Sequence, residues 1–328
     1  MPTLSTKENF MRLITGQMPE YIPDYDMMWS FNVPPFMFGQ FNPDGVSKDM
    51  FGVEQVRDSG GIVPASMPKT HDFVLTDITK WRDVVKLPDT SDFDWAAAGK
   101  AALDMRNPEL PSGGMAGMGF FQPLVGLMGF DEGLCACFEE PEEVKALMEY
   151  ICDFYVDAAK NLIYYYKVDF GAFGDDIAHE RNPFLSLEMF QDLIAPYWRR
   201  YYAVFAEAGL PAGMHNCGHF ELYLDDLVDM GVTFWDPVQN TNDMVAIKDK
   251  FGRRLAMCEA YDARFLGDAD EEEVRASFRE HLNKVAPGGG YALFNHNPDM
   301  MLAFNKDEIE KAGWAWDEFN KLRYDFYK

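Results

Sequence analysis

Two residues with metal-binding side chains, His215 and Cys217, stand one position apart in this chain. Because side chains alternate along a strand, a His-x-Cys pair at a strand end directs an imidazole and a thiol to the same side. Zinc binds this mixture of nitrogen and sulfur ligands. The alternative is that both residues are buried in the core, where free cysteines are common.

Residues with acid, imidazole or thiol side chains also end the other predicted strands. In chain order these residues are Asp26 with Trp29, Asp175 with Asp176, His215 with Cys217, Asp236, Cys258 with Glu259 and Asp262, and Asn295 with His296. Zinc requires three or four ligands at about 2.0–2.3 Å, and adjacent strands are close enough for their ends to converge on one ion. The expected metal ligands therefore come from His215, Cys217, Asp236, Cys258 and His296.

Three further residues near strand ends are the predicted catalytic groups, namely Asp26, Asp176 and His179. Asp176 and His179 would orient a substrate hydroxyl, and the alternative is that they hold a loop in place. Asp236 precedes Pro237, so it has a similar alternative as the cap of a turn.

The chain is rich in aromatic residues, at 15%, and contains 20 methionines. An apolar pocket is expected among the aromatic residues near the strand ends, because small-molecule sites are mostly apolar. The candidates are Trp29, Phe31, Phe121 and Trp235. Core packing is the alternative for each of them.

Strands that place these residues together must be parallel, and the sequence after residue 140 has the matching alternation of strands and helices. The predicted strands are 169–176, 214–217, 232–237, 254–258 and 288–296, and the predicted helices are 141–167, 186–208, 220–230, 244–251, 270–285 and 307–324. Such alternation favours a (β/α)8 barrel with its active site at the carboxyl ends of the strands, and a doubly wound open sheet is the alternative.

The first third of the chain is less regular. Early barrel strands are expected near 21–29, 61–63 and 115–121, after an N-terminal helix that begins with a capping box formed by Ser5 and Glu8. No linker divides the chain, so residues 1–328 are predicted to form a single α/β domain.

The chain is strongly acidic, with 54 Asp and Glu against 29 Lys and Arg and a net charge of −25. Nucleic acid and anionic membranes are therefore not expected as partners. Five cysteines at irregular spacing argue against a disulfide framework. We see neither a membrane-spanning run nor a signal peptide, so the expected location is the cytoplasm.

Several stretches of the chain resemble the uroporphyrinogen decarboxylase superfamily. They are His215-Asn216-Cys217-Gly218, Met230-Gly231-Val232, Asp236-Pro237-Val238-Gln239, Lys250-Phe251-Gly252-Arg253-Arg254-Leu255, Tyr261-Asp262 and Gly288-Gly289-Gly290-Tyr291. The resemblance implies a distorted (β/α)8 barrel. One branch of this superfamily decarboxylates a tetrapyrrole, and another contains zinc-dependent methyltransferases that work with corrinoid proteins.

The resemblance favours the methyltransferase branch. The decarboxylases carry an N-terminal motif with an arginine that receives porphyrin carboxylates, and the corresponding stretch here, 22–32, has none. The methyltransferases bind zinc through His-x-Cys, which His215 and Cys217 match, and through a later Cys, where this chain offers His296. O-demethylase relatives vary their ligands, so Cys258 or Asp236 could complete the set.

The resulting expectation is a zinc enzyme that takes a methyl group from a small methylated donor, in particular an aromatic methyl ether, and passes it to the Co(I) corrinoid of a partner protein. A homodimer is left open. Methyl transfer from the corrinoid to a thiol, tetrapyrrole decarboxylation and ligand binding without catalysis are the alternatives.

Overall fold

The computed structural model describes residues 2–25, 30–37, 39, 42–57, 66–69, 72–294 and 306–328. Three of the predicted site residues, Asp26, Trp29 and His296, lie outside these ranges, as does the strand expected at 61–63. Within the described ranges, no helix is both long enough and apolar enough to cross a membrane.

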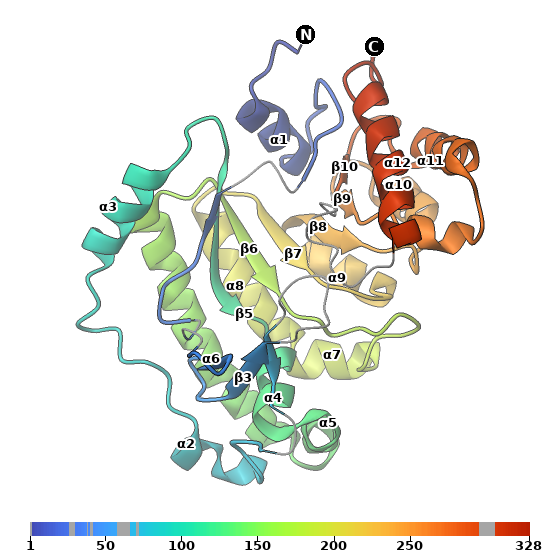
Figure 1. Cartoon of the computed structure of the whole chain (residues 1–328). Helices are drawn as coiled ribbons and strands as arrows, with labels where there is room; N and C mark the ends of the chain where they lie inside the picture. Colours follow the sequence, from blue (N-terminus) through green and yellow to red (C-terminus); the bar gives the residue numbers. More distant parts are fainter. Residues whose placement is uncertain are drawn as a thin grey trace.

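A curled, parallel sheet of seven strands is the centre of the fold, in the order β1-β5-β6-β7-β8-β9-β10 (Figure 1). Its strands are β1 (Ser30–Asn32), β5 (Ser112–Met118), β6 (Phe170–Gly174), β7 (Ala212–His215), β8 (Val232–Val238), β9 (Ala256–Glu259) and β10 (Tyr291–Leu293). Together with the helices around it, the sheet forms a distorted (β/α)8-type barrel, which confirms the predicted fold class.

At the open side of the sheet, the last strand pairs with a segment near the N-terminus. Asp24 forms a parallel bridge with Leu293 of β10, and the Tyr25 N–H donates to the Leu293 carbonyl at 2.8 Å. A few residues later β1 pairs with β5. The segment 23–32 thus contributes hydrogen bonds to both the last and the second strand of the sheet, on either side of its undescribed residues.

Helices surround the sheet on its outer face and at its two ends (Figure 1). They are α1 (Thr6–Ile14), α2 (Trp81–Val84), α3 (Trp95–Met105), α4 (Phe121–Met128), α5 (Phe130–Glu139), α6 (Pro141–Asn161), α7 (Leu187–Leu193), α8 (Ala195–Glu207), α9 (Leu224–Asp229), α10 (Met244–Phe251), α11 (Glu271–Val285) and α12 (Lys306–Leu322). The helix predicted at 186–208 is divided in two, with Pro196 at the start of α8. Proline at a helix start lacks only an N–H that has no helical acceptor there.

Helix α1 covers the end of the sheet at which the strands begin. The predicted capping box is present, with the Ser5 side chain accepting from the Glu8 N–H and the Glu8 carboxylate accepting from the Ser5 N–H. Phe10 and Leu13 of α1 are fully buried and pack with Phe170 and Phe234 inside the curled sheet. Because these apolar side chains fill the interior at that end, the opposite end of the sheet remains available for a site.

A second, antiparallel sheet lies beside that opposite end. It consists of β2 (Val46–Lys48), β3 (Glu54–Arg57) and β4 (Ser66–Pro68). In Figure 1 it lies next to the start of α4, which directly follows β5. The small sheet and α4 together form the walls of the cavity described below.

Candidate metal site and adjoining cavity

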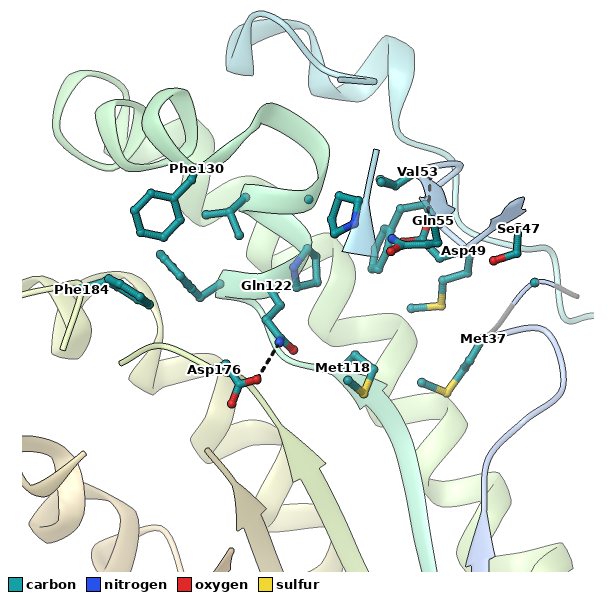
Figure 2. A pocket seen from close by; sticks show the side chains of 18 residues that line it. Met37, Ser47, Asp49, Val53, Gln55, Met118, Gln122, Phe130, Asp176 and Phe184 are labelled. Atoms are coloured by element: carbon teal, nitrogen blue, oxygen red, sulfur yellow. Dashed lines mark hydrogen bonds between the residues drawn. The ribbon is translucent and has the colours of Figure 1, made fainter. Parts of the chain in front are cut away.

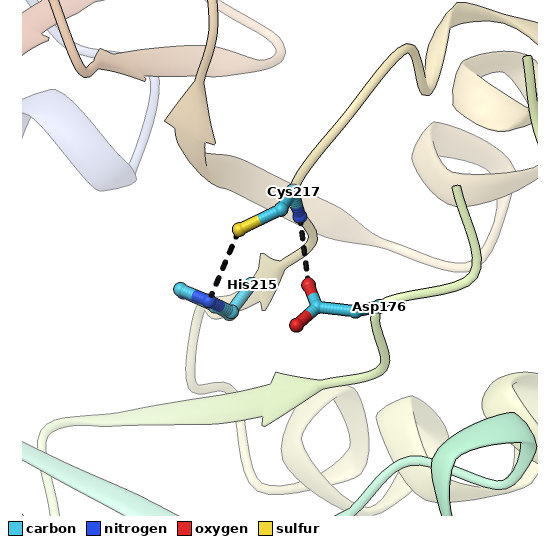
Figure 3. Close-up of side chains that lie close together, drawn as sticks. All are labelled: Asp176, His215 and Cys217. Carbon is cyan, nitrogen blue, oxygen red and sulfur yellow. Dashed lines mark hydrogen bonds between the residues drawn. The ribbon is translucent and has the colours of Figure 1, made fainter. Parts of the chain in front are cut away.

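Three side chains with different donor atoms meet at the carboxyl ends of β6 and β7. One ligand atom each from Asp176, His215 and Cys217 lies within 4.8 Å of the other two (Figure 3). His215 and Cys217 point to the same side as predicted, with 3.9 Å between Nε2 and Sγ. Asp176, which we expected to act in catalysis, lies with them as a third candidate ligand.

The loop after β7 holds Cys217 in this position. The Cys217 N–H donates to Asp176 Oδ1 at 2.8 Å, and the Gly218 N–H donates to the Gln239 side chain at 2.7 Å. Gly218 has a φ of +86°, and a Cβ there would lie 2.7 Å from the carbonyl oxygens of Ala178 and His179. Only glycine fits this turn without displacing the backbone, so the residue after the cysteine helps to define the site.

Asp236 contacts Nδ1 of His215, the ring nitrogen that does not face Cys217. Its Oδ1 lies 2.6 Å from His215 Nδ1, because His215 and Asp236 are opposite each other in the paired strands β7 and β8. Its other oxygen, Oδ2, accepts from the buried Tyr25 hydroxyl at 2.7 Å. We expected Asp236 as a metal ligand, whereas this geometry is that of a carboxylate that orients a ligating histidine and leaves Nε2 for the metal.

Both His215 and Cys217 have pKa values above their ordinary ones, so each holds its proton more tightly in the metal-free site. Burial opposes the charged imidazole, but the Asp236 carboxylate outweighs it and raises the pKa of His215 well above its ordinary value. Burial also raises the pKa of the Cys217 thiol, although His215 opposes that shift. A metal ion would displace both protons, since zinc binds the neutral imidazole and the thiolate.

The three donors fit zinc. A carboxylate oxygen, an imidazole nitrogen and a thiol sulfur are all zinc ligands, and catalytic zinc sites have three protein ligands with a further position open. The His215 side chain is 43% exposed, so the site is accessible from outside.

Cys258 does not belong to this group of described residues. It is fully buried inside the curled sheet, in the apolar cluster with Phe10, Phe234 and Ala292. Its neighbour Glu259 points to the helical layer and accepts from the Tyr291 hydroxyl at 2.5 Å and from His281 Nε2 at 2.8 Å. The core alternative noted for the cysteine therefore describes its position better than a ligand role.

Asp175, the residue before Asp176 at the end of β6, has a different environment from its neighbour. Asp175 is fully buried and accepts hydrogen bonds from the N–H groups of Phe120, Phe121 and Gln122 at the start of α4, and from the Trp198 indole. Burial raises the pKa of Asp175 to about 6 in spite of these bonds. Its carboxylate thus fixes the start of α4.

A cavity of about 560 Å³ adjoins the metal-site residues, with Asp176 in its wall (Figure 2). Gln122 of α4 joins the two features, because its Nε2 donates to Asp176 Oδ2 at 3.2 Å and its side chain lines the cavity. The rest of the lining is mostly apolar and includes Met37, Met50, Met118, Phe51, Phe121, Phe130 and Phe184.

The predicted pocket residues are distributed over different places. Phe121 lines the cavity and stacks on Phe184, with ring centroids 5.5 Å apart. Phe31 is 48% exposed beside α3, in a separate groove. Trp235 is fully buried, and its indole N–H donates to the Asn216 carbonyl at 2.9 Å, which supports the loop between His215 and Cys217.

His179 lies at the rim of the site. It is exposed, and its ring centroid is 6.5 Å from that of Phe184. Sequence reasoning missed Gln122, Tyr25 and Asn216, which fix the candidate ligands. Their amide and hydroxyl groups have no spacing pattern that would have revealed them.

Comparison with known proteins agrees with this architecture. The sequence profile described as Uroporphyrinogen decarboxylase (URO-D) matches residues 62–306, so the chain belongs to the uroporphyrinogen decarboxylase family. The solved structure of a methyltransferase from Methanosarcina mazei is similar, with a TM-score of 0.62, 12% sequence identity, and coverage of 97% of this chain and 99% of that one. At this identity the likeness shows a shared fold. No curated protein matches the chain by sequence.

Proposed function

We propose that this protein is a zinc-dependent methyltransferase. It takes a methyl group from a small methylated donor, in particular an aromatic methyl ether, and transfers it to the Co(I) corrinoid of a partner protein. The observation that supports this most is the position of Asp176, which belongs both to the group of three metal-binding side chains and to the wall of an aromatic cavity.

In this proposal Asp176, His215 and Cys217 hold the ion. Zinc would act as a Lewis acid toward the ether oxygen, on which negative charge develops as the methyl group leaves. Asp236 keeps Nε2 of His215 directed to the site, and Gln122 keeps the Asp176 carboxylate in place. Phe121 and Phe184 would pack against the donor's ring and exclude water from it. His179 is a candidate for contact with a donor hydroxyl at the rim.

A direct test uses the full-length, zinc-loaded protein with 2-methoxyphenol and cob(I)alamin, the free cofactor standing in for the partner protein. The expected products are methylcobalamin and catechol, both measured by chromatography. Cys217→Ala is expected to abolish the reaction, whereas the matched variant Cys135→Ala, at an exposed position in α5, should retain it. A zinc-loaded protein that binds methoxyphenols and forms no methylcobalamin would contradict the proposal.

Decarboxylation of a tetrapyrrole is the second candidate, and the family match favours it. Uroporphyrinogen carries eight carboxylates, which would need cationic side chains to receive them. Release of carbon dioxide from uroporphyrinogen by metal-free protein would establish this candidate over the methyltransferase.

A further inference from the structure

The cavity beside the metal-site residues has two carboxylates in its wall. Asp176 lines the part next to His215 and Cys217, and Asp49 lines the part formed by β2 and β3 (Figure 2). Among the described residues of the lining there is no lysine, arginine or histidine. In the proposed zinc-bound state Asp176 is engaged by the ion, so Asp49 is the carboxylate that gives this mostly apolar cavity a negative potential, because low-dielectric surroundings screen charge poorly.

The Asp49 carboxylate is held rigidly. Its Oδ1 accepts from the N–H groups of Phe51 and Val53 at 2.9 and 3.0 Å, and its Oδ2 accepts from Gln55 Nε2 at 2.8 Å. Burial raises the pKa of Asp49 above its ordinary value, although these three bonds oppose the shift. The group therefore cannot turn away from a bound ligand without losing three hydrogen bonds.

Two lysines near the small sheet form ion pairs outside the cavity. Lys48 and Lys69 both pair with Glu54, at 3.6 and 3.1 Å, and their side chains are largely exposed. Neither residue is part of the cavity lining. The negative potential inside the cavity is therefore not neutralised by these two side chains.

The remaining wall suits a flat ring. Phe121 and Phe184 stack with their ring planes 16° apart, and Phe130 meets Phe184 edge-on at 4.9 Å. The methionines opposite, Met37 and Met118, offer polarisable thioethers that make favourable contacts with aromatic rings. Phenylalanine faces also attract cations.

We infer that this cavity selects aromatic methyl donors that carry no carboxylate, so that neutral and positively charged methoxyarenes bind and methoxybenzoates are rejected. The inference rests on the proposed function for its choice of a methoxyarene. It assigns Asp49 as a residue that determines specificity through charge.

Three ligands test this inference, because they share the ring, the hydroxyl and the methoxy group and differ only in charge. They are 4-hydroxy-3-methoxybenzyl alcohol, the corresponding benzylamine and the corresponding benzoate. Calorimetric titration of the full-length, zinc-free protein avoids direct binding of the benzoate to the metal. The alcohol and the amine should bind on the order of tenfold or more tightly than the benzoate. Equal or tighter binding of the benzoate, or no binding of any of the three, would overturn the inference.

Asp49→Asn supplies a second test. The asparagine oxygen can still accept from Phe51 and Val53, so the turn should remain folded while one negative charge is lost. Benzoate affinity should rise several-fold and alcohol affinity should stay the same, and Asp44→Asn, at an exposed position nearby, should change neither. An unaltered preference in a folded Asp49→Asn variant would refute the role of Asp49. These binding measurements need no corrinoid, so a failure of methyl transfer alone would count against the proposed function and not against charge selection.

Discussion

The two faces of the strand ends use the same residue types for different purposes. On the inner face, Asp176 lies with His215 and Cys217 and opens to a cavity. On the outer face, its neighbour Asp175 is fully buried and satisfies three backbone N–H groups and an indole. Successive side chains on a strand point in opposite directions, so adjacent acids can have unrelated roles. The role of an acidic residue at a strand end thus depends on the direction in which its side chain points as well as on its residue type.

The largest expected effect separates two cysteines. Cys217→Ala or Asp176→Ala should remove stoichiometric zinc from the purified protein, because two remaining ligands hold zinc poorly. Cys258→Ala should retain zinc, since its sulfur lies in the apolar interior of the sheet. Metal analysis after dialysis against a mild chelator makes the comparison. Loss of zinc from Cys258→Ala, in a protein whose circular dichroism is unchanged, would show that our choice of ligands is wrong.

A smaller effect separates the two aspartates. Asp175→Ala should lower the free energy of unfolding by about 3–5 kcal/mol, because it leaves several buried donors at the start of α4 without an acceptor. Asp176→Ala should cost less than about 1 kcal/mol in the metal-free protein, since its carboxylate is only partly buried. Urea unfolding of both variants gives the two values. Equal costs would erase the distinction between the inner and outer faces.

The smallest effect concerns the residues behind His215. Asp236→Asn should weaken zinc binding by roughly 10–100-fold, because the histidine loses the carboxylate that orients its ring. Tyr25→Phe should weaken it by only about threefold, since Tyr25 acts through Asp236. Competition with a chromogenic chelator measures both affinities. Tyr223→Phe is the control, because that buried hydroxyl bonds to Leu185 and not to the site, and an equal loss there would point to a general packing effect.

The sequence was sufficient for the parts of the fold that depend on local pattern. The helix at 244–251, the capping box at Ser5 and the order of strands after residue 140 are present as predicted. The division of the helix at 186–208 and the small sheet β2–β4 were not foreseen. The small sheet forms from short strands whose pairing depends on packing against α4 and the cavity. The spacing of apolar residues in the sequence does not indicate such contacts.

The sequence predicted the site residues whose positions depend on one strand or on two adjacent strands, and it misplaced those whose positions depend on the whole sheet. His215 and Cys217 could be paired because a strand fixes their direction, and Asp176 could be placed near them because β6 and β7 are adjacent. Asp236 and Cys258 were expected as ligands on the same reasoning, but strand register places one behind the histidine and the other in the core. Register and the inward or outward phase of each strand are set by the whole barrel.

The pairing of Asp24 with Leu293 has a consequence for the synthesis of the protein. A chain growing on the ribosome presents residue 24 long before its partner strand β10 has been made, and a contact of such long sequence separation forms slowly. Tyr25, in the same segment, is a hydrogen-bond partner of Asp236. Nascent chains that stop short of β10 would thus lack the contact that anchors this tyrosine, so its hydrogen bond to Asp236 should form only after β10 has been made.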